Sequence, residues 1–133
     1  MTEIYAKTIT DADIVTFAGI SGDTNPVHIN QEFARDTRFE GRIAHGMLVA
    51  SFISTVIGTK LPGPGCIYLN QTLSFKAPVM VGDTVKARAT VSRLIPEKKF
   101  VEMATVCTVG DKVVIDGLAL ILVATRAALA KAS

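Results

Sequence analysis

The sequence predicts an α+β domain in which an antiparallel sheet packs on one long buried helix. Up to Pro62 the chain combines helical apolar spacing with polar turns, whereas after Gly65 apolar and polar side chains alternate with a period of two. Helices and strands that separate along the chain are typical of α+β proteins rather than of alternating βαβ units. The 133 residues, 49% hydrophobic and 20% charged, fit a single folded domain, residues 1–133.

The first half is predicted to hold a short edge strand and two helices ahead of the long helix. The strand covers residues 4–9. Thr10 is a good N-cap for a helix over 11–20, because its hydroxyl can accept from a free backbone N–H of the first turn. Asn30 can cap a second short helix, "QEFARDT", in which we expect Phe33 to point inward.

The long helix is predicted over residues 45–60, ended by Gly58 and Pro62. Its apolar side chains cover nearly every direction around the axis, which indicates a buried helix. One narrow polar stripe interrupts them, formed by Ser51, Ser54 and Thr55. Hydroxyls in a helix often bond back to the carbonyl one turn earlier, so the stripe by itself does not establish a site.

Four strands are predicted in the second half, over residues 66–75, 84–95, 99–109 and 112–125. The turns between the last three are short, so neighbouring strands should be antiparallel. Gly117, inside the last strand, suggests a bulge. A sheet of about five strands can enclose the long helix only if it curls, and its open side still needs cover. We therefore expect a homodimer.

Composition excludes several classes of protein. A net charge of +2 without a Lys/Arg cluster gives no reason to expect nucleic acid. Cys66 and Cys107 lack the spacing of zinc or thioredoxin-like motifs. The N-terminus has no basic segment followed by an apolar run, and no apolar stretch is long enough for a membrane span. We expect a cytoplasmic protein with no membrane contact.

Two segments hold the candidate chemistry. In "GDTNPVHIN", Asp23 and His28 lie five residues apart across an Asn-Pro turn that can direct both side chains to one water as an acid–base pair. Most such pairs in loops are only structural. At the start of the long helix, in "RIAHGML", the Gly46 N–H lies at the positive end of the helix and could stabilise an oxyanion. Gly46 could equally serve close packing.

These segments resemble the MaoC-like (R)-specific enoyl-CoA hydratases. The resemblance runs from about Phe17 to Val91 and rests on D-x-N-P-x-H preceding "HGM" and a long helix, followed by "YLNQTLSFKAPVMVGD". It implies a hot-dog fold, in which a curved antiparallel sheet wraps a long central helix, and a dimer. It also implies reversible hydration of trans-2-enoyl-CoA to (R)-3-hydroxyacyl-CoA.

The resemblance also implies a role for each matching residue. Asp23 and His28 match the catalytic dyad, Gly46 the oxyanion donor to the thioester, and Ser54 a residue that supports the dyad. The resemblance implies no metal or redox cofactor. Coenzyme A is part of the substrate and does not count as a cofactor. Two alternatives stay open: an acyl-CoA thioesterase, since one fold hosts both activities, and a dehydratase subunit that needs a partner and acts on acyl-carrier-protein substrates.

The sequence also offers candidates for binding the two ends of the substrate. Residues that could close the acyl pocket are Val27, Ile29, Leu61 and Leu69. Lys76 and Arg88 could meet the coenzyme A phosphates. Arg42, with residues 35–42, could form a lid over the site.

Overall fold

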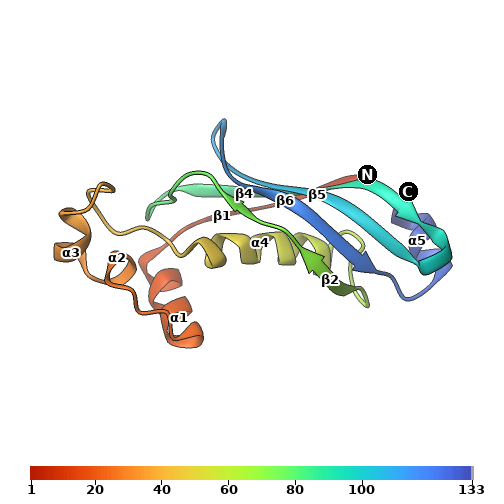
Figure 1. Cartoon of the computed structure of the whole chain (residues 1–133), viewed down its shortest axis with the longest axis horizontal. Helices are drawn as coiled ribbons and strands as arrows, with labels where there is room; N and C mark the ends of the chain where they lie inside the picture. Colours follow the sequence, from red (N-terminus) through yellow and green to blue (C-terminus); the bar gives the residue numbers. More distant parts are fainter. Residues whose placement is uncertain (133) are drawn as a thin grey trace.

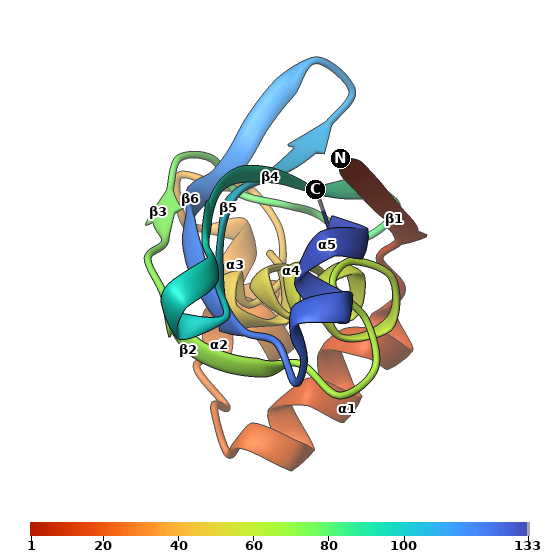
Figure 2. The same cartoon turned by 90° about the vertical axis from the view of Figure 1, so that its right-hand side faces the viewer.

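A computed structural model describes residues 1–132. One antiparallel sheet curls around the helix α4 (Gly46–Thr59), as the end-on view in Figure 2 shows. The strand order is β1-β4-β5-β6-β2, with the short β3 paired to β6. The strands are β1 (Thr2–Thr8), β2 (Ile67–Gln71), β3 (Ser74–Phe75), β4 (Thr84–Ile95), β5 (Phe100–Val109) and β6 (Lys112–Leu122). The predicted curved sheet on a long helix is therefore confirmed.

The remaining helices lie at the two ends of the molecule. Figure 1 shows α1, α2 and α3 gathered beyond the N-terminal end of α4, while α5 lies at the opposite end near both termini. Their bounds are α1 (Asp11–Ser21), α2 (Pro26–Ile29), α3 (Gln31–Arg35) and α5 (Arg126–Ala132), with a 3-10 turn at Pro96–Lys98. None of the helices in the described residues is long and apolar enough to cross a bilayer.

The core lies between the concave face of the sheet and α4. In β4, Val85, Ala87 and Ala89 are fully buried while Lys86 and Arg88 are exposed, as the alternation predicts. From α4 the buried side chains are Leu48, Val49, Ala50, Phe52, Ile53, Val56 and Ile57.

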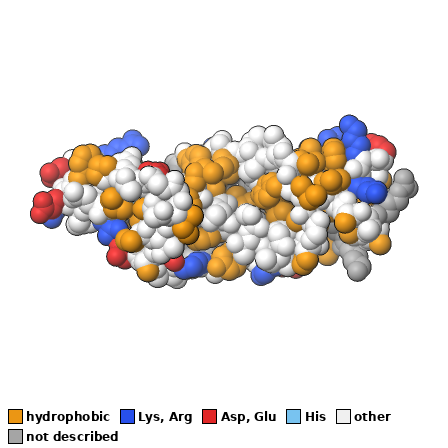
Figure 3. Space-filling view, turned by 90° about the horizontal axis from the view of Figure 1, so that it is seen from below, with side chains coloured by type: hydrophobic (Ala, Val, Ile, Leu, Met, Phe, Trp, Pro, Cys, Tyr) orange, Lys and Arg blue, Asp and Glu red, His pale blue; other side chains and the backbone are white. Residues whose placement is uncertain are grey.

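One face of α4 is not covered by its own chain. Met47 is 57% exposed, and Ser51, Ser54 and Gly58 along the same stripe are exposed too. The single chain therefore has the open side that the sequence predicted for this helix, and the polar residues Ser51 and Ser54 lie on it. Figure 3 views the molecule from below, the side opposite the sheet, and hydrophobic side chains gather over its middle.

Three expectations about single residues need correction. Phe33 is 51% exposed, and Ala34 is the buried residue of α3. Gly58 lies inside α4 rather than ending it. Gly117 sits in regular register with Thr105, whereas the β6 bulge lies at Val114, between pairs Cys107–Ile115 and Thr108–Val113. Gly117 is required by close approach instead, since a Cβ there would lie 1.8 Å from the Thr72 carbonyl oxygen.

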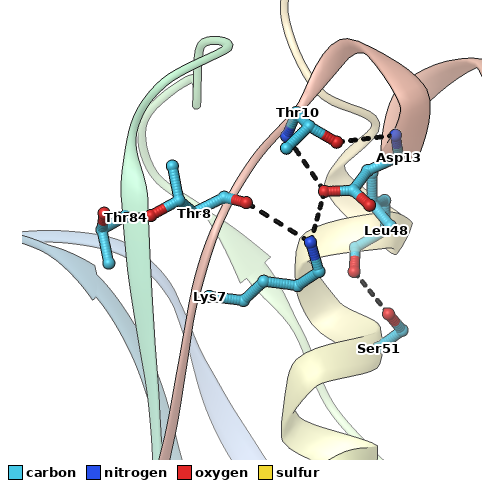
Figure 4. A network of polar contacts seen from close by, with 7 residues as sticks. All are labelled: Lys7, Thr8, Thr10, Asp13, Leu48, Ser51 and Thr84. Carbon is cyan, nitrogen blue, oxygen red and sulfur yellow. Dashed lines mark hydrogen bonds and ion pairs between the residues drawn. The ribbon is translucent and has the colours of Figure 1, made fainter.

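A polar network fixes the entry into α1 (Figure 4). Thr10 caps α1 by accepting from the Asp13 N–H, and the Asp13 carboxylate accepts in return from the Thr10 N–H, the predicted N-cap in a full capping box. Lys7 at the end of β1 pairs with the same carboxylate at 2.6 Å. Lys7, followed by the Thr10 N–H, holds the pKa of Asp13 below its ordinary value. Helix α1 is thereby anchored to the sheet beside α4.

Candidate active site

The loop between α1 and α2 presents Asp23. Gly22 ends α1 in a left-handed conformation with φ of 79°. The Asn25 side chain accepts from the Val27 N–H and caps α2, so the expected Asn-Pro turn is one turn of helix. Asp23 is exposed, and one of its carboxylate oxygens accepts from the Asn25 N–H at 3.2 Å. Asn25 and Pro26 therefore shape the backbone that carries Asp23.

His28 is only 8% exposed and has a defined hydrogen bond. Its Nδ1 lies 2.8 Å from the carbonyl oxygen of Ile43. Because a carbonyl only accepts, Nδ1 carries the proton, and the neutral ring keeps an unprotonated Nε2. Ile43 is itself held by its N–H bond to Val27 and by a bridge to Met80. The ring is thus fixed with a basic nitrogen available.

Arg42 secures the backbone of this region. Its Nε donates to the His28 carbonyl at 2.5 Å, and its guanidinium pairs with Asp11 at 2.6 Å. A residue bonded on both sides joins α1 to α2 and does not act as a free lid. Further along the suggested lid segment, Arg38 and Phe39 do line the pocket described below.

Gly46 is the first residue of α4. The first hydrogen bonds of the helix run from the Leu48 and Val49 N–H groups to the His45 carbonyl, so the Gly46 N–H precedes the helical ladder. An ideal Cβ on Gly46 would lie 2.7 Å from two ring carbons of Phe75. Gly46 can therefore serve both roles suggested by the sequence, because it packs closely against Phe75 and still has a backbone N–H free to stabilise an oxyanion.

A pocket of about 460 Å³ brings together Asp23, His28 and Gly46. Its other lining residues are Arg38, Phe39, Ile43, Ala44, His45, Met47, Val49, Phe75, Lys76, Ala77, Pro78, Val79 and Ile115. Ser54 is absent from this lining and lies two turns along α4 on the exposed stripe. Within one chain, Ser54 does not reach the dyad.

Of the residues suggested to bind the two ends of the substrate, only one lies at the pocket. Lys76 lines it, whereas Arg88 is an exposed residue of β4 outside it. None of the four suggested acyl-pocket residues, Val27, Ile29, Leu61 and Leu69, lines it.

Sequence reasoning assigned no role to His45 or Phe75, and it placed Arg38 only within the suggested lid segment, residues 35–42. Chain position gave no signal for them, since the fold brings each to the site from a different segment. The nearest hint was the position of His45 directly before Gly46.

Asp23, His28 and His45 form the one group in the described residues with metal-binding potential. Their candidate ligand atoms lie within 4.8 Å of one another. Each histidine also has one ring nitrogen bonded to a backbone carbonyl, an arrangement found in metal sites as well as in acid–base sites. The expectation of no metal stays a prediction.

Comparison with known proteins decides the family. The family model described as MaoC-like domain matches residues 2–114. The chain belongs to the MaoC-like family. It is 61% identical over 121 residues to the (R)-specific enoyl-CoA hydratase of Rhodospirillum rubrum, covering 91% of this chain and 84% of that one.

Two further relatives agree. The MaoC-like chain is 51% identical to the 3-hydroxybutyryl-CoA dehydratase of Methylorubrum extorquens, over 92% of this chain and 78% of that one. It superposes on the (R)-hydratase structure from Aeromonas caviae with a TM-score of 0.90 and 40% identity, covering 92% and 94% of the two chains. The hot-dog fold implied by the sequence is therefore confirmed.

Proposed function

We propose that this MaoC-like protein is an (R)-specific enoyl-CoA hydratase, which adds water reversibly to trans-2-enoyl-CoA. The observation that carries the proposal is the pocket in which Asp23, His28 and the Gly46 N–H converge. The relatives named as (R)-specific hydratases support the same activity.

The site geometry supports the following sequence of bond changes. A water molecule held by the His28 Nε2 and the free carboxylate oxygen of Asp23 gives up one proton to this pair. Its oxygen bonds to C3 of the enoyl group, and the π electrons move onto the thioester oxygen. The Gly46 N–H at the helix N-terminus stabilises that negative charge. A proton from the pair then goes to C2, so one whole water is added and there is no net oxidation or reduction.

We also propose that the coenzyme A part of the substrate, which carries the acyl group, binds at the mouth of the pocket. Arg38, whose guanidinium stacks over the Phe39 ring at 4.8 Å, and Lys76 are the two cationic side chains that line the pocket. Cations at this position favour the phosphates of a coenzyme A thioester. Arg38→Ala and Lys76→Ala should raise KM for crotonyl-CoA but not for its N-acetylcysteamine thioester, which carries no phosphate.

The matched control for the pocket mouth is Arg88→Ala, which removes a cation outside the pocket. Equal KM changes with both thioesters, or a change in the control, would argue against this assignment. A carrier-protein thioester turned over far better than crotonyl-CoA would favour the carrier-protein alternative.

We infer a homodimer in which the partner closes the site. Met47 and Phe75 line the pocket yet are 57% and 54% exposed, so the pocket is open on this side. Ser54 lies on the same exposed stripe of α4 as Met47, and would face a second chain packed there. Its implied support of the dyad would then act across the interface.

Mixed dimers test this arrangement. If Ser54 acts on the partner's dyad, a dimer of one Asp23→Asn chain and one Ser54→Ala chain contains one complete site. Its activity should reach up to half that of wild type. If Ser54 acts within its own chain, the mixed dimer should not exceed half the activity of the Ser54→Ala homodimer. A monomer by sedimentation would overturn the inference altogether.

The activity is tested directly by the loss of ultraviolet absorbance of crotonyl-CoA, with the product identified by an (R)-specific dehydrogenase. Formation of (R)-3-hydroxybutyryl-CoA is expected. Release of free thiol without a hydroxyacyl product would instead identify a thioesterase. The expected cytoplasmic location stays a prediction.

A further inference from the structure

His45 lies beneath the dyad and contacts both of its members. Its side chain is 2% exposed. Its ring stacks on His28, with centroids 3.9 Å apart and planes 26° apart, and Phe17 packs against it with centroids 4.8 Å apart. Its Nε2 lies 2.9 Å from the carbonyl oxygen of Asp23. One buried ring therefore touches the two residues that the proposed mechanism needs.

The hydrogen bond defines the protonation of the His45 ring. A carbonyl oxygen accepts, so Nε2 carries the proton, and the neutral ring leaves a lone pair on Nδ1. This Nδ1 is buried and has no hydrogen-bond partner among residues 1–132. A buried acceptor without a donor destabilises a fold. Stability alone therefore does not account for a histidine here.

Asp23 has few other restraints. It lies in the loop after Gly22, and its own backbone N–H bonds only to the Ser21 hydroxyl at 3.1 Å. Its carboxylate bonds within the same loop, to the Asn25 N–H. The bond from His45 is the one described hydrogen bond that ties Asp23 to the base of α4. Loss of this bond would let the carboxylate move relative to His28.

We propose that His45 is the positioning residue of the dyad: its N–H holds the Asp23 backbone while its ring face fixes the plane of His28. This inference rests on the proposed hydratase function. The reaction requires both groups to face one water, and misplacement by about 1 Å can cost on the order of 100-fold in rate. Although His45 lines the pocket, its side chain is buried, so we assign it no contact with the reacting water or thioester and no proton transfer.

Two substitutions separate the two contacts. His45→Phe keeps a ring against His28 but removes the donor to Asp23. His45→Gln keeps an N–H near the position of Nε2 but removes the ring. Phe17→Leu is the matched control, because it reduces packing against the His45 ring and leaves both dyad contacts intact.

For His45→Phe, we expect kcat with crotonyl-CoA to fall roughly 10- to 100-fold, with KM within about twofold of wild type. Its melting temperature should be unchanged or higher, because the unsatisfied Nδ1 is gone. His45→Gln should recover part of the lost kcat despite a lower melting temperature. Phe17→Leu should lower the melting temperature without changing kcat. A kcat for His45→Phe within twofold of wild type, or losses that only follow the folded fraction, would overturn the proposal.

A second readout does not depend on activity. The chain has only two histidines, so the imidazole nitrogen NMR spectrum reports His28 and His45 alone. In wild type one ring should be protonated at Nδ1 and the other at Nε2. Because Ile43 sets the His28 tautomer, His45→Gln should keep that tautomer but shift and broaden the His28 ring signals, since the stacked ring is gone. Two Nδ1-protonated rings, or an unchanged His28 in His45→Gln, would refute the positioning role. A wild type without hydratase activity but with the expected spectra would refute the proposed function instead.

Discussion

Replacing Gly46 with alanine tests the most exacting part of the site. An ideal Cβ would lie 2.7 Å from Phe75 Cδ1 and Cε1, and ordinary contact begins at 3.4 Å, so the ring must move by at least 3.4 − 2.7 = 0.7 Å. Phe75 is 54% exposed and can yield. We therefore expect a stability loss of about 1 kcal/mol, the low end for overpacking.

The effect of Gly46→Ala on the rate should be much larger. An oxyanion donor must come within about 2.7–3.1 Å of the charged oxygen, and loss of one such donor costs roughly 10²–10³ in kcat. The added methyl group and the displaced Phe75 ring would both lie in the pocket wall beside the Gly46 N–H, where the thioester oxygen has to bind. Crotonyl-CoA hydration, measured beside thermal unfolding, should show this loss in a folded protein.

The double variant Gly46→Ala/Phe75→Ala separates packing from chemistry. Removing the ring relieves the clash, so stability lost through overpacking should return while the rate stays low, provided that Phe75→Ala alone remains active. If the double variant recovered the rate of Phe75→Ala, Gly46 would serve packing only. A single variant within about threefold of wild type would refute the oxyanion assignment outright.

Three further outcomes are expected. The folded protein stabilises the charged form of Asp13 and lowers its pKa below the ordinary 3.8, so Asp13 contributes fully to stability above about pH 4 and loses this contribution as the pH falls through the lowered pKa. The difference in melting temperature between wild type and Asp13→Asn should therefore be present at pH 7 and vanish in acid. A difference that stays constant with pH would contradict this. Burial raises the pKa of Cys107 to about 12, so a thiol reagent at pH 8 should label Cys107 only after unfolding, and rapid labelling of Cys107 itself, as distinct from the partly buried Cys66, in the native protein would be the contrary result. Dialysis against EDTA should leave kcat unchanged, whereas a loss restored by one added divalent metal would show that Asp23, His28 and His45 hold an ion.

The sheet could be predicted because its signals are local. The alternation in residues 84–95 has the same bounds as β4, and the capping residue Thr10 marks the start of α1. The open side of α4 was predicted from the small size of the sheet, but its extent was not, because the curvature of the sheet determines how far the helix is enclosed. Phe33 points outward for a similar reason, since α3 projects beyond the sheet.

The candidate site was predictable in part. Asp23, His28 and Gly46 carry motif spacing, and the fold brings them into one pocket. The contacts of His45 with Asp23 and His28 span 22 and 17 residues of chain, and they depend on how the α1–α2 loop folds over the start of α4. Ser54 matches a position of the family motif but does not contact the dyad within one chain. Its role therefore depends on the proposed dimer, which cannot be worked out from the sequence of one chain.

We propose that Asp23 and His28 together activate water for hydration of an enoyl-CoA. The most direct measurement is kcat/KM for crotonyl-CoA in Asp23→Asn and His28→Ala, with folding checked by thermal unfolding. A positioned acid–base group contributes roughly 10²–10⁴ in rate. We therefore expect both variants to be folded, each to lose at least about 100-fold, and the double variant to lose little more than either alone. Near wild-type hydration by either folded variant would contradict the account.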